Sequence, residues 1–130
     1  MPTLFDASAR IVLLGLSVLA LSACGDEGAK PDWRPKVIAD AEAEIRARLG
    51  DPAAHFANVQ VVGDQATGQT CGYVTAKPPA SASGGTGRFI VYVSHDAGPF
   101  IEYSVGISTI PQRQFEFQWL HDCLDEGYRA

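Results

Sequence analysis

Three cysteines are the residues of this chain whose side chains could do chemistry most directly. They are Cys24, Cys71 and Cys123. A thiol can stay free, can ligate a metal ion as a thiolate, or can be oxidised to a disulfide. Cys71 opens the segment TCGYVTAK, so the fate of its sulfur depends on what becomes of the other two.

A short apolar segment precedes Cys24. Residues 11–23, IVLLGLSVLALSA, follow Arg10 and form the uninterrupted core that is typical of a signal peptide. The run is shorter than the about 20 apolar residues that a membrane-spanning helix needs.

The ending of this segment sets it apart from an ordinary secretory signal or a buried helix. Residues 21–24, LSAC, resemble the lipobox of bacterial lipoproteins. The resemblance implies that residues 1–23 are removed as a lipoprotein signal peptide. It also implies that Cys24 becomes the acylated N-terminus, with fatty acids such as palmitate attached.

With Cys24 acylated, the other two cysteines remain as an even pair. The periplasm oxidises such pairs in exported chains, so we expect a disulfide between Cys71 and Cys123. In the chain-entropy model a loop of this length stabilises the fold by about 4 kcal/mol. A zinc site needs about four ligands. Neither cysteine has a CxxC or CxH neighbour, and His121 precedes Cys123 by only two residues, so we expect no metal.

Charge and composition limit the classes of partner. The chain has a formal net charge of −5, whereas nucleic-acid binding relies on clustered Lys and Arg. Nucleic acid is therefore not an expected partner. Residues 24–35, CGDEGAKPDWRP, are polar and predict a tether, and residues 36–130 predict a single domain.

The residue after Cys24 bears on the location. It is Gly25, whereas an Asp in that place resembles the inner-membrane retention signal, so its absence favours the outer membrane. The expected location is the bacterial cell envelope, with the chain lipid-anchored and facing the periplasm.

The mature part begins with a predicted helix and continues with strands. Residues 36–49 have apolar side chains at helical spacing, and Gly50 suits the C-terminal cap. DPAAHF, residues 51–56, predicts a short turn that brings Phe56 into the core. Beyond it the apolar period becomes two. Four predicted strands, broken by Gly- and Pro-rich turns, are ANVQVVG, TCGYVTAK, GRFIVYVSH and FIEYSVGIS.

A second helix closes the chain. Pro111 suits its first turn, the side chains of Phe115, Trp119 and Cys123 recur at four-residue intervals, and Gly127 can end it. The predicted fold class is α+β: an N-terminal helix, a four-stranded antiparallel meander and a C-terminal helix that the Cys71–Cys123 disulfide ties to the sheet.

These segments carry a resemblance. LGDPAAHFANVQVVG, CGYVTAK, GRFIVYV and WLHDC resemble a family of small, uncharacterised proteobacterial lipoproteins and secreted proteins with Leu-x-Asp-Pro-x-x-x-x-Phe and Cys-Gly-x-Val-x-Ala-Lys segments. The resemblance covers about residues 45–123. It implies no activity, so it assigns no catalytic residue and no cofactor.

The sequence itself assembles no catalytic group. Ser94, His95 and Asp96 are triad residue types, but neighbours on a strand point to opposite faces and cannot form the relay. GGTG at 84–87 lacks the Lys-Ser/Thr of a phosphate loop. Glu102 is a single carboxylate, and acid–base chemistry needs a partner for it. We expect a protein that is not an enzyme.

A binding module is the competing hypothesis. Residues 78–87, PPASASGGTG, make a long hairpin connection, and long loops in compact domains tend to be functional or disordered. Lys77 and Arg88 flank the loop and could hold an anionic envelope component. A solvated loop with charged residues at an edge hairpin is the simpler interpretation.

The function expected from these observations is a membrane-anchored envelope lipoprotein that acts as a non-catalytic binding or structural module. One alternative is a periplasmic enzyme inhibitor, because SASGG resembles faintly the loop of the periplasmic lysozyme inhibitors; their all-β barrel differs from the fold expected here. The other is a small envelope hydrolase, for which Glu102 and His95 would be tested first.

Overall fold

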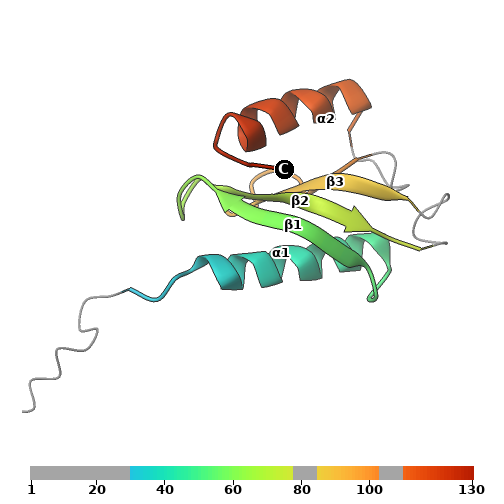
Figure 1. Ribbon diagram of the computed structural model, residues 1–130, viewed down its shortest axis with the longest axis horizontal. Coiled ribbons are helices and arrows are strands. Elements are labelled where there is room, and N and C mark those ends of the chain that lie inside the picture. Colours follow the sequence, from blue (N-terminus) through green and yellow to red (C-terminus); the bar gives the residue numbers. More distant parts are fainter. Residues whose placement is uncertain (1–29, 78–84, 103–109) are drawn as a thin grey trace, which may run out of the picture. The chain divides into compact units, whose positions relative to one another are not determined.

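The computed structural model describes residues 30–77, 85–102 and 110–130. Residues 31–130 belong to one compact unit. In that unit a four-stranded antiparallel sheet has a helix on each face (Figure 1). The predicted fold class is confirmed, with the two helices, the meander and the connecting disulfide.

Helix α1 (Arg34–Leu49) begins two residues before the predicted helix. The Asp32 carboxylate accepts a hydrogen bond from the backbone N–H of Arg34 at 3.1 Å, which satisfies one of the free donors at the helix start. Gly50 ends the helix in the left-handed conformation, with φ 63°, as its position predicted. The side chains that face the sheet are Ala41, Ile45 and Leu49.

The sheet is a simple meander in the order β1-β2-β3-β4, so each strand pairs with the next one in the sequence. Its strands are β1 (His55–Val62), β2 (Gln69–Thr75), β3 (Thr86–Tyr92) and β4 (Phe100–Ile101). A turn at 52–53 leads into β1, which already includes Phe56. The continuation predicted for the fourth strand falls on 103–109, outside the described residues.

A bulge interrupts β1. Ala57 pairs with Tyr73 and Gln60 with Cys71, so two residues of β1 lie opposite the single residue Gly72. The first of them, Asn58, has φ 50°, a value that Asn tolerates better than most residues. A Cβ built on Gly72 would lie 3.0 Å from Val59 Cγ2 and 3.1 Å from Phe89 Cε1. A Cβ at this position would therefore require Val59 or Phe89 to shift by a few tenths of an ångström, so glycine suits the close approach of the bulged strand.

Side chains alternate between two buried layers. Cys71 and Tyr73 of β2 point toward the C-terminal helix, whereas Val74 points toward α1. In the same way Ile90 and Phe89 of β3 belong to opposite layers. Both faces of the central strands are therefore covered, and β2 and β3 are buried along most of their length, including the polar residues Gln69 and Thr70 of β2.

The C-terminal helix consists of α2 (Gln112–Gln118) and its direct continuation η2 (Trp119–Leu124), which has wider π-type turns. The backbone N–H of Asp125 donates to the carbonyl of Leu120, and that of Tyr128 to the carbonyl of Cys123, both five residues back. Trp119 and Cys123 are both buried against the sheet. The wider turns are a feature that the sequence pattern did not predict.

Candidate functional site

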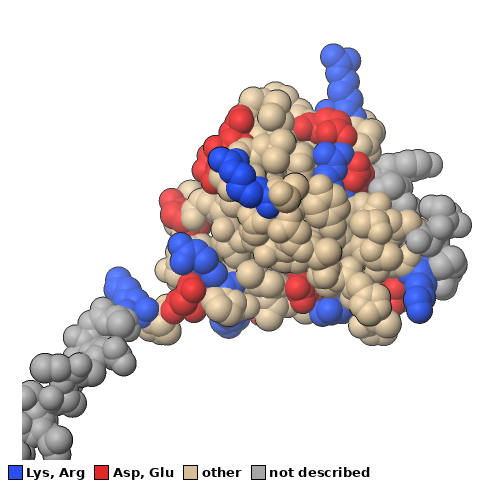
Figure 2. Space-filling view, viewed as in Figure 1, with Lys and Arg blue, Asp and Glu red and all other residues tan. Residues whose placement is uncertain are grey.

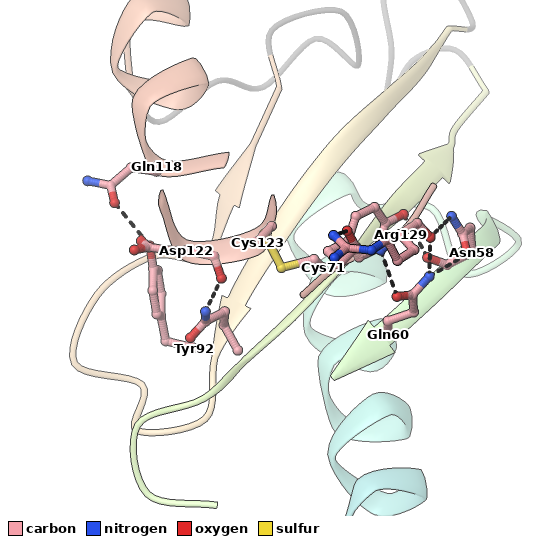
Figure 3. Close-up of a disulfide and its surroundings, with 10 residues drawn as sticks. Asn58, Gln60, Cys71, Tyr92, Gln118, Asp122, Cys123 and Arg129 are labelled. Atoms are coloured by element: carbon pink, nitrogen blue, oxygen red, sulfur yellow. Dashed lines mark hydrogen bonds between the residues drawn. A yellow bond between two sulfur atoms is a disulfide. The ribbon is translucent and has the colours of Figure 1, made fainter. Parts of the chain in front are cut away.

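The disulfide links strand β2 to the C-terminal helix within the buried layer between them. Cys71 lies in β2 and Cys123 in η2, their Cα atoms are 6.1 Å apart, and both residues are fully buried (Figure 3). The predicted pairing is confirmed. Neither sulfur is open to solvent, so the disulfide has a structural place in the fold. The predicted lipid site, Cys24, lies outside the described residues.

A charged group, which we call the Arg88 cluster, lies beside the disulfide layer and consists of Arg88, Glu102, Gln112 and Glu116. Arg88 comes from β3, and its Nε donates to Glu102 Oε2 at 3.0 Å. Its Nη1 donates to Glu116 Oε2 at 3.2 Å, and Gln112 Nε2 donates to Glu102 Oε1 at 3.0 Å. One cation is thus shared by two carboxylates.

The surroundings of this cluster keep its groups charged. The hydrogen bonds from Arg88 lower the pKa of Glu102 to about 2, against the opposing effect of burial. The same partner lowers the pKa of Glu116. Hydrogen bonding to Glu102 raises the pKa of Arg88 above its usual value. The guanidinium also lies 5.3 Å from the ring centre of Phe115 and 5.2 Å from that of Trp119, within cation–π range.

These electrostatics restrict what the cluster can do chemically. A general acid needs a carboxyl whose pKa lies near the working pH, and both Glu102 and Glu116 are shifted in the opposite direction. The sequence suggested that Glu102 is a carboxylate without a partner, but it forms an ion pair with Arg88. The side chains of this pair are only 17% exposed for Arg88 and 15% exposed for Glu102. The cluster holds β3, the start of the segment after β4, and α2 together.

The predicted anion site of Lys77 and Arg88 gains no support from this geometry. Arg88 is shared by two carboxylates and its side chain is largely buried, so it offers no free positive charge at the base of the loop. Lys77 is exposed, and its backbone N–H donates to the Asp51 carboxylate at 3.1 Å. That bond, with a second one from Ala53, lowers the pKa of Asp51. Loop residues 78–84 lie outside the described residues.

The triad residue types lie in a turn and not on a strand, and the backbone N–H of Asp96 donates to Ser94 Oγ at 3.4 Å. Strand β3 ends at Tyr92, so Ser94, His95 and Asp96 lie in the turn after it. His95 has φ 57°, and its Nδ1 lies 3.4 Å from Glu44 Oε2 of α1. Glu102 pairs with Arg88 near the start of β3, whereas His95 lies beyond its end. The two residues proposed for a hydrolase are therefore not brought together.

A polar group that the sequence did not indicate fastens η2 to the sheet. The Tyr92 hydroxyl donates to the Asp122 carboxylate, and the Gln69 amide donates to the Asp122 backbone carbonyl (Figure 3). Burial, followed by the Asp122 carboxylate, raises the pKa of the Tyr92 hydroxyl above its usual value. These contacts flank the disulfide and fix the same turn of η2.

The last residues form a second fastening on the bulge of β1. The hydroxyl of Tyr128, a fully buried residue, donates to the backbone carbonyl of Asn58 at 2.8 Å. The Gln60 side chain accepts from the Arg129 backbone N–H at 3.1 Å, and the Asn58 amide donates to the Arg129 carbonyl at 3.1 Å (Figure 3). Two features of the sequence could have indicated this contact. Asn58 is a residue type that tolerates the positive φ of the bulge, and the aromatic residue Tyr128 follows Gly127.

The outer face of the C-terminal helix is apolar. The exposed large hydrophobic residues of the described chain all lie on it: Phe117 (59% exposed), Leu120 (47%) and Leu124 (38%). We call these three residues the apolar ridge. Their spacing of three and four places them on one side of the helix, while Phe115, Trp119 and Cys123 are buried. The sequence showed these residues without indicating that they face solvent.

Residues 30–77, 85–102 and 110–130 contain no group of three or more His, Cys, Asp or Glu side chains placed to hold a metal ion. Within the same ranges, no helix has the length and apolar character needed to span a membrane.

Comparison with known proteins returns nothing: no protein family, curated protein or solved structure matches this chain. The resemblance to small uncharacterised lipoproteins stays a prediction from the sequence segments.

Proposed function

We propose that this chain is an exported lipoprotein of the bacterial envelope, anchored by acyl groups on Cys24, and that its folded unit is a non-catalytic binding module. The observation that carries the proposal is the fully buried disulfide between Cys71 and Cys123. Disulfides form and persist in oxidising compartments such as the periplasm and are rare in the cytosol. A structural disulfide agrees with the export that the LSAC sequence at 21–24 implies.

The arrangement of ionisable groups supports a non-catalytic role. The Arg88 cluster keeps both of its carboxylates charged and engaged, so neither is available to donate a proton near neutral pH. His95 lies in the turn after the end of β3, whereas Glu102 follows β4 and pairs with Arg88 near the start of β3. The unit has two helices packed on a sheet and one exposed apolar face. Such a face is typical of a surface that binds another molecule, which favours a binding role over a catalytic one.

Membrane fractionation tests the anchor. The full chain and its Cys24→Ala variant are expressed in a Gram-negative bacterium, and carbonate-washed membranes are compared with the soluble fraction. We expect the parent chain in the membranes and the variant outside them. A Cys71→Ala/Cys123→Ala variant is the matched control, because it removes two thiols but keeps Cys24. Equal membrane retention of the parent and Cys24→Ala would overturn the proposal.

A second experiment tests the binding role. Crosslinked native envelopes are probed with the full chain and with Lys77→Ala, which leaves the Arg88 cluster intact. A partner that is captured by the parent chain supports a binding module, and its loss with Lys77→Ala would place the contact at the 78–87 loop. Turnover of an envelope substrate by the purified chain would contradict the non-catalytic role.

A further inference from the structure

The apolar ridge of Phe117, Leu120 and Leu124 lacks a partner among the described residues. The Phe117 ring packs on the ring of His121, with 4.3 Å between the ring centres, so His121 extends the same surface between the two leucines. Exposed side chains of this size, side by side on a small protein, mark an interaction site.

The charges at the two ends of the ridge have opposite signs. Arg113 lies four residues before Phe117 and is exposed, and Asp125 and Glu126 are exposed just after Leu124. Acidic side chains gather over the last turns of this helix (Figure 2). The helix dipole favours the reverse order, with acids at the N-terminal end and bases at the C-terminal end. Asp125 is engaged within the helix, because its Oδ2 lies 3.1 Å from His121 Nδ1, whereas the placement of Arg113 and Glu126 runs against the dipole.

The same order fits a second copy of the chain. Two identical helices packed antiparallel about a two-fold axis would each bring the Arg113 end of one to within about one turn of Asp125 and Glu126 of the other, so opposite charges meet at both ends. Leu120 and His121 would then lie at the axis, with Phe117 of each copy against Leu124 of the other. An anionic membrane surface fits poorly, because the acidic end of the ridge would be repelled.

We infer that the apolar ridge is a self-association surface, on which two copies of this chain pack antiparallel through their C-terminal helices. One face of one helix is smaller than the about 800 Å² per partner of a standard stable interface. The contact is therefore weak between free molecules. Anchoring on a shared membrane, as proposed above, would strengthen it by raising the local concentration.

Site-specific crosslinking tests this inference. The full chain with His121→Cys is expressed in the bacterial host and treated in intact cells with a short bis-maleimide. Residue 121 lies near the inferred axis, so the two engineered thiols should face one another and give a covalent dimer. The matched control is Ala47→Cys, an exposed position on α1 on the other face of the sheet. The parent chain measures any background from Cys24.

Charge exchange makes the test specific. In the His121→Cys background, Arg113→Asp and Asp125→Lys should each lower the dimer yield, by about three- to tenfold for two surface pairs. The combination Arg113→Asp/Asp125→Lys should restore it, because each copy again offers opposite charges. Equal yields for the His121→Cys and Ala47→Cys chains would overturn the inference, as would a combined variant no better than the single ones.

The fractionation of the same samples reports on the anchor separately. If the dimer forms although the chain is found in the soluble fraction, the self-association is supported and the lipid anchor is contradicted. If the chain is found in the membranes but gives no dimer, the anchor is supported and the contact through the apolar ridge is contradicted. Capture of another protein through His121→Cys, with no dimer, would assign the ridge to a different partner and contradict the inference.

Discussion

Arg88 and Glu102 form the most enclosed ion pair among the described residues, with the guanidinium held against the carboxylate and over the ring of Trp119. The backbone N–H of Arg88 also donates to Glu102 Oε2 at 2.8 Å, so the carboxylate is bound by main chain and side chain together. The pair lies between β3 and the C-terminal helix, and the ion pairs of Arg88 with Glu102 and Glu116 connect these elements. The Arg88 guanidinium is therefore not free to bind an anionic ligand.

Replacement of Arg88 by Met should destabilise the fold. Glu102 would lose its charged partner while remaining largely enclosed, and hydrogen bonds to charged groups contribute about 1.5–3 kcal/mol. We expect the free energy of unfolding at pH 7 to fall by about 2 kcal/mol in urea denaturation. Lys36→Met, which breaks the exposed pair with Asp40, is the control and should change it by less than about 0.5 kcal/mol. Equal effects of the two variants would refute the structural role of Arg88.

Stability should depend on pH through Glu102. Its pKa in the folded chain is about 2, below the ordinary value of 4.5. The unfolded chain therefore binds more protons between these values, and the free energy of unfolding falls as the pH is lowered from about 5 toward 2. Glu102→Gln should flatten this part of the profile. An unchanged acid limb in the variant would show that Glu102 is not the group responsible.

Loss of the disulfide should strongly destabilise the fold. Cys71→Ala/Cys123→Ala removes a crosslink over 52 residues and leaves a gap between fully buried positions. Removing a native disulfide from a small secreted domain typically lowers the free energy of unfolding by about 2–5 kcal/mol. Denaturation of the parent chain with and without dithiothreitol is the matching control. A double variant as stable as the oxidised parent would contradict the prediction.

Much of the architecture could be predicted because it depends on local pattern. Helix α1 follows from the spacing of Ala41, Ile45 and Leu49, and its end follows from Gly50, whose glycine readily adopts the left-handed conformation. The Cys71–Cys123 pairing followed from parity alone once Cys24 was assigned elsewhere.

The candidate site could not be predicted in the same way because its residues come together only through the fold. Glu102 and Glu116 lie 14 and 28 residues from Arg88 and reach it from different elements. The wide turns of η2 were not signalled by any periodic pattern. The only local hint was a charged residue, Arg88, within the otherwise apolar stretch of β3.

The closing contact of the chain gives another prediction. Tyr128→Phe keeps the ring, which packs edge-on against Trp119 at 5.0 Å between centres, and removes only the hydrogen bond to Asn58. We expect the free energy of unfolding to fall by about 1 kcal/mol. Tyr128→Ala removes the buried ring as well and should lower it by about 3–5 kcal/mol. Thermal or urea unfolding measures both, and a loss as large for Phe as for Ala would show that the hydroxyl carries the whole effect.

Gly72 tests the bulge in β1. Gly72→Ala would place a Cβ about 3 Å from Val59 and Phe89, and both neighbours lie in packed strands. Overpacking of this kind typically lowers the free energy of unfolding by about 1–3 kcal/mol. Ala57→Gly, at an exposed position of the same strand, is a control for the effect of backbone freedom. A neutral Gly72→Ala variant would mean that the strands can separate at the bulge.

The most direct measurement of the central claim is the intact mass of the full chain recovered from bacterial membranes without reduction. We predict a chain that begins at Cys24, carries the mass of a diacylglyceryl group and an amide-linked fatty acid, and is two hydrogens lighter than its reduced form because of the Cys71–Cys123 bond. Cys24→Ala should abolish the lipid mass and leave the disulfide. A recovered chain that retains residues 1–23, or begins at Cys24 without lipid, would contradict the lipoprotein account.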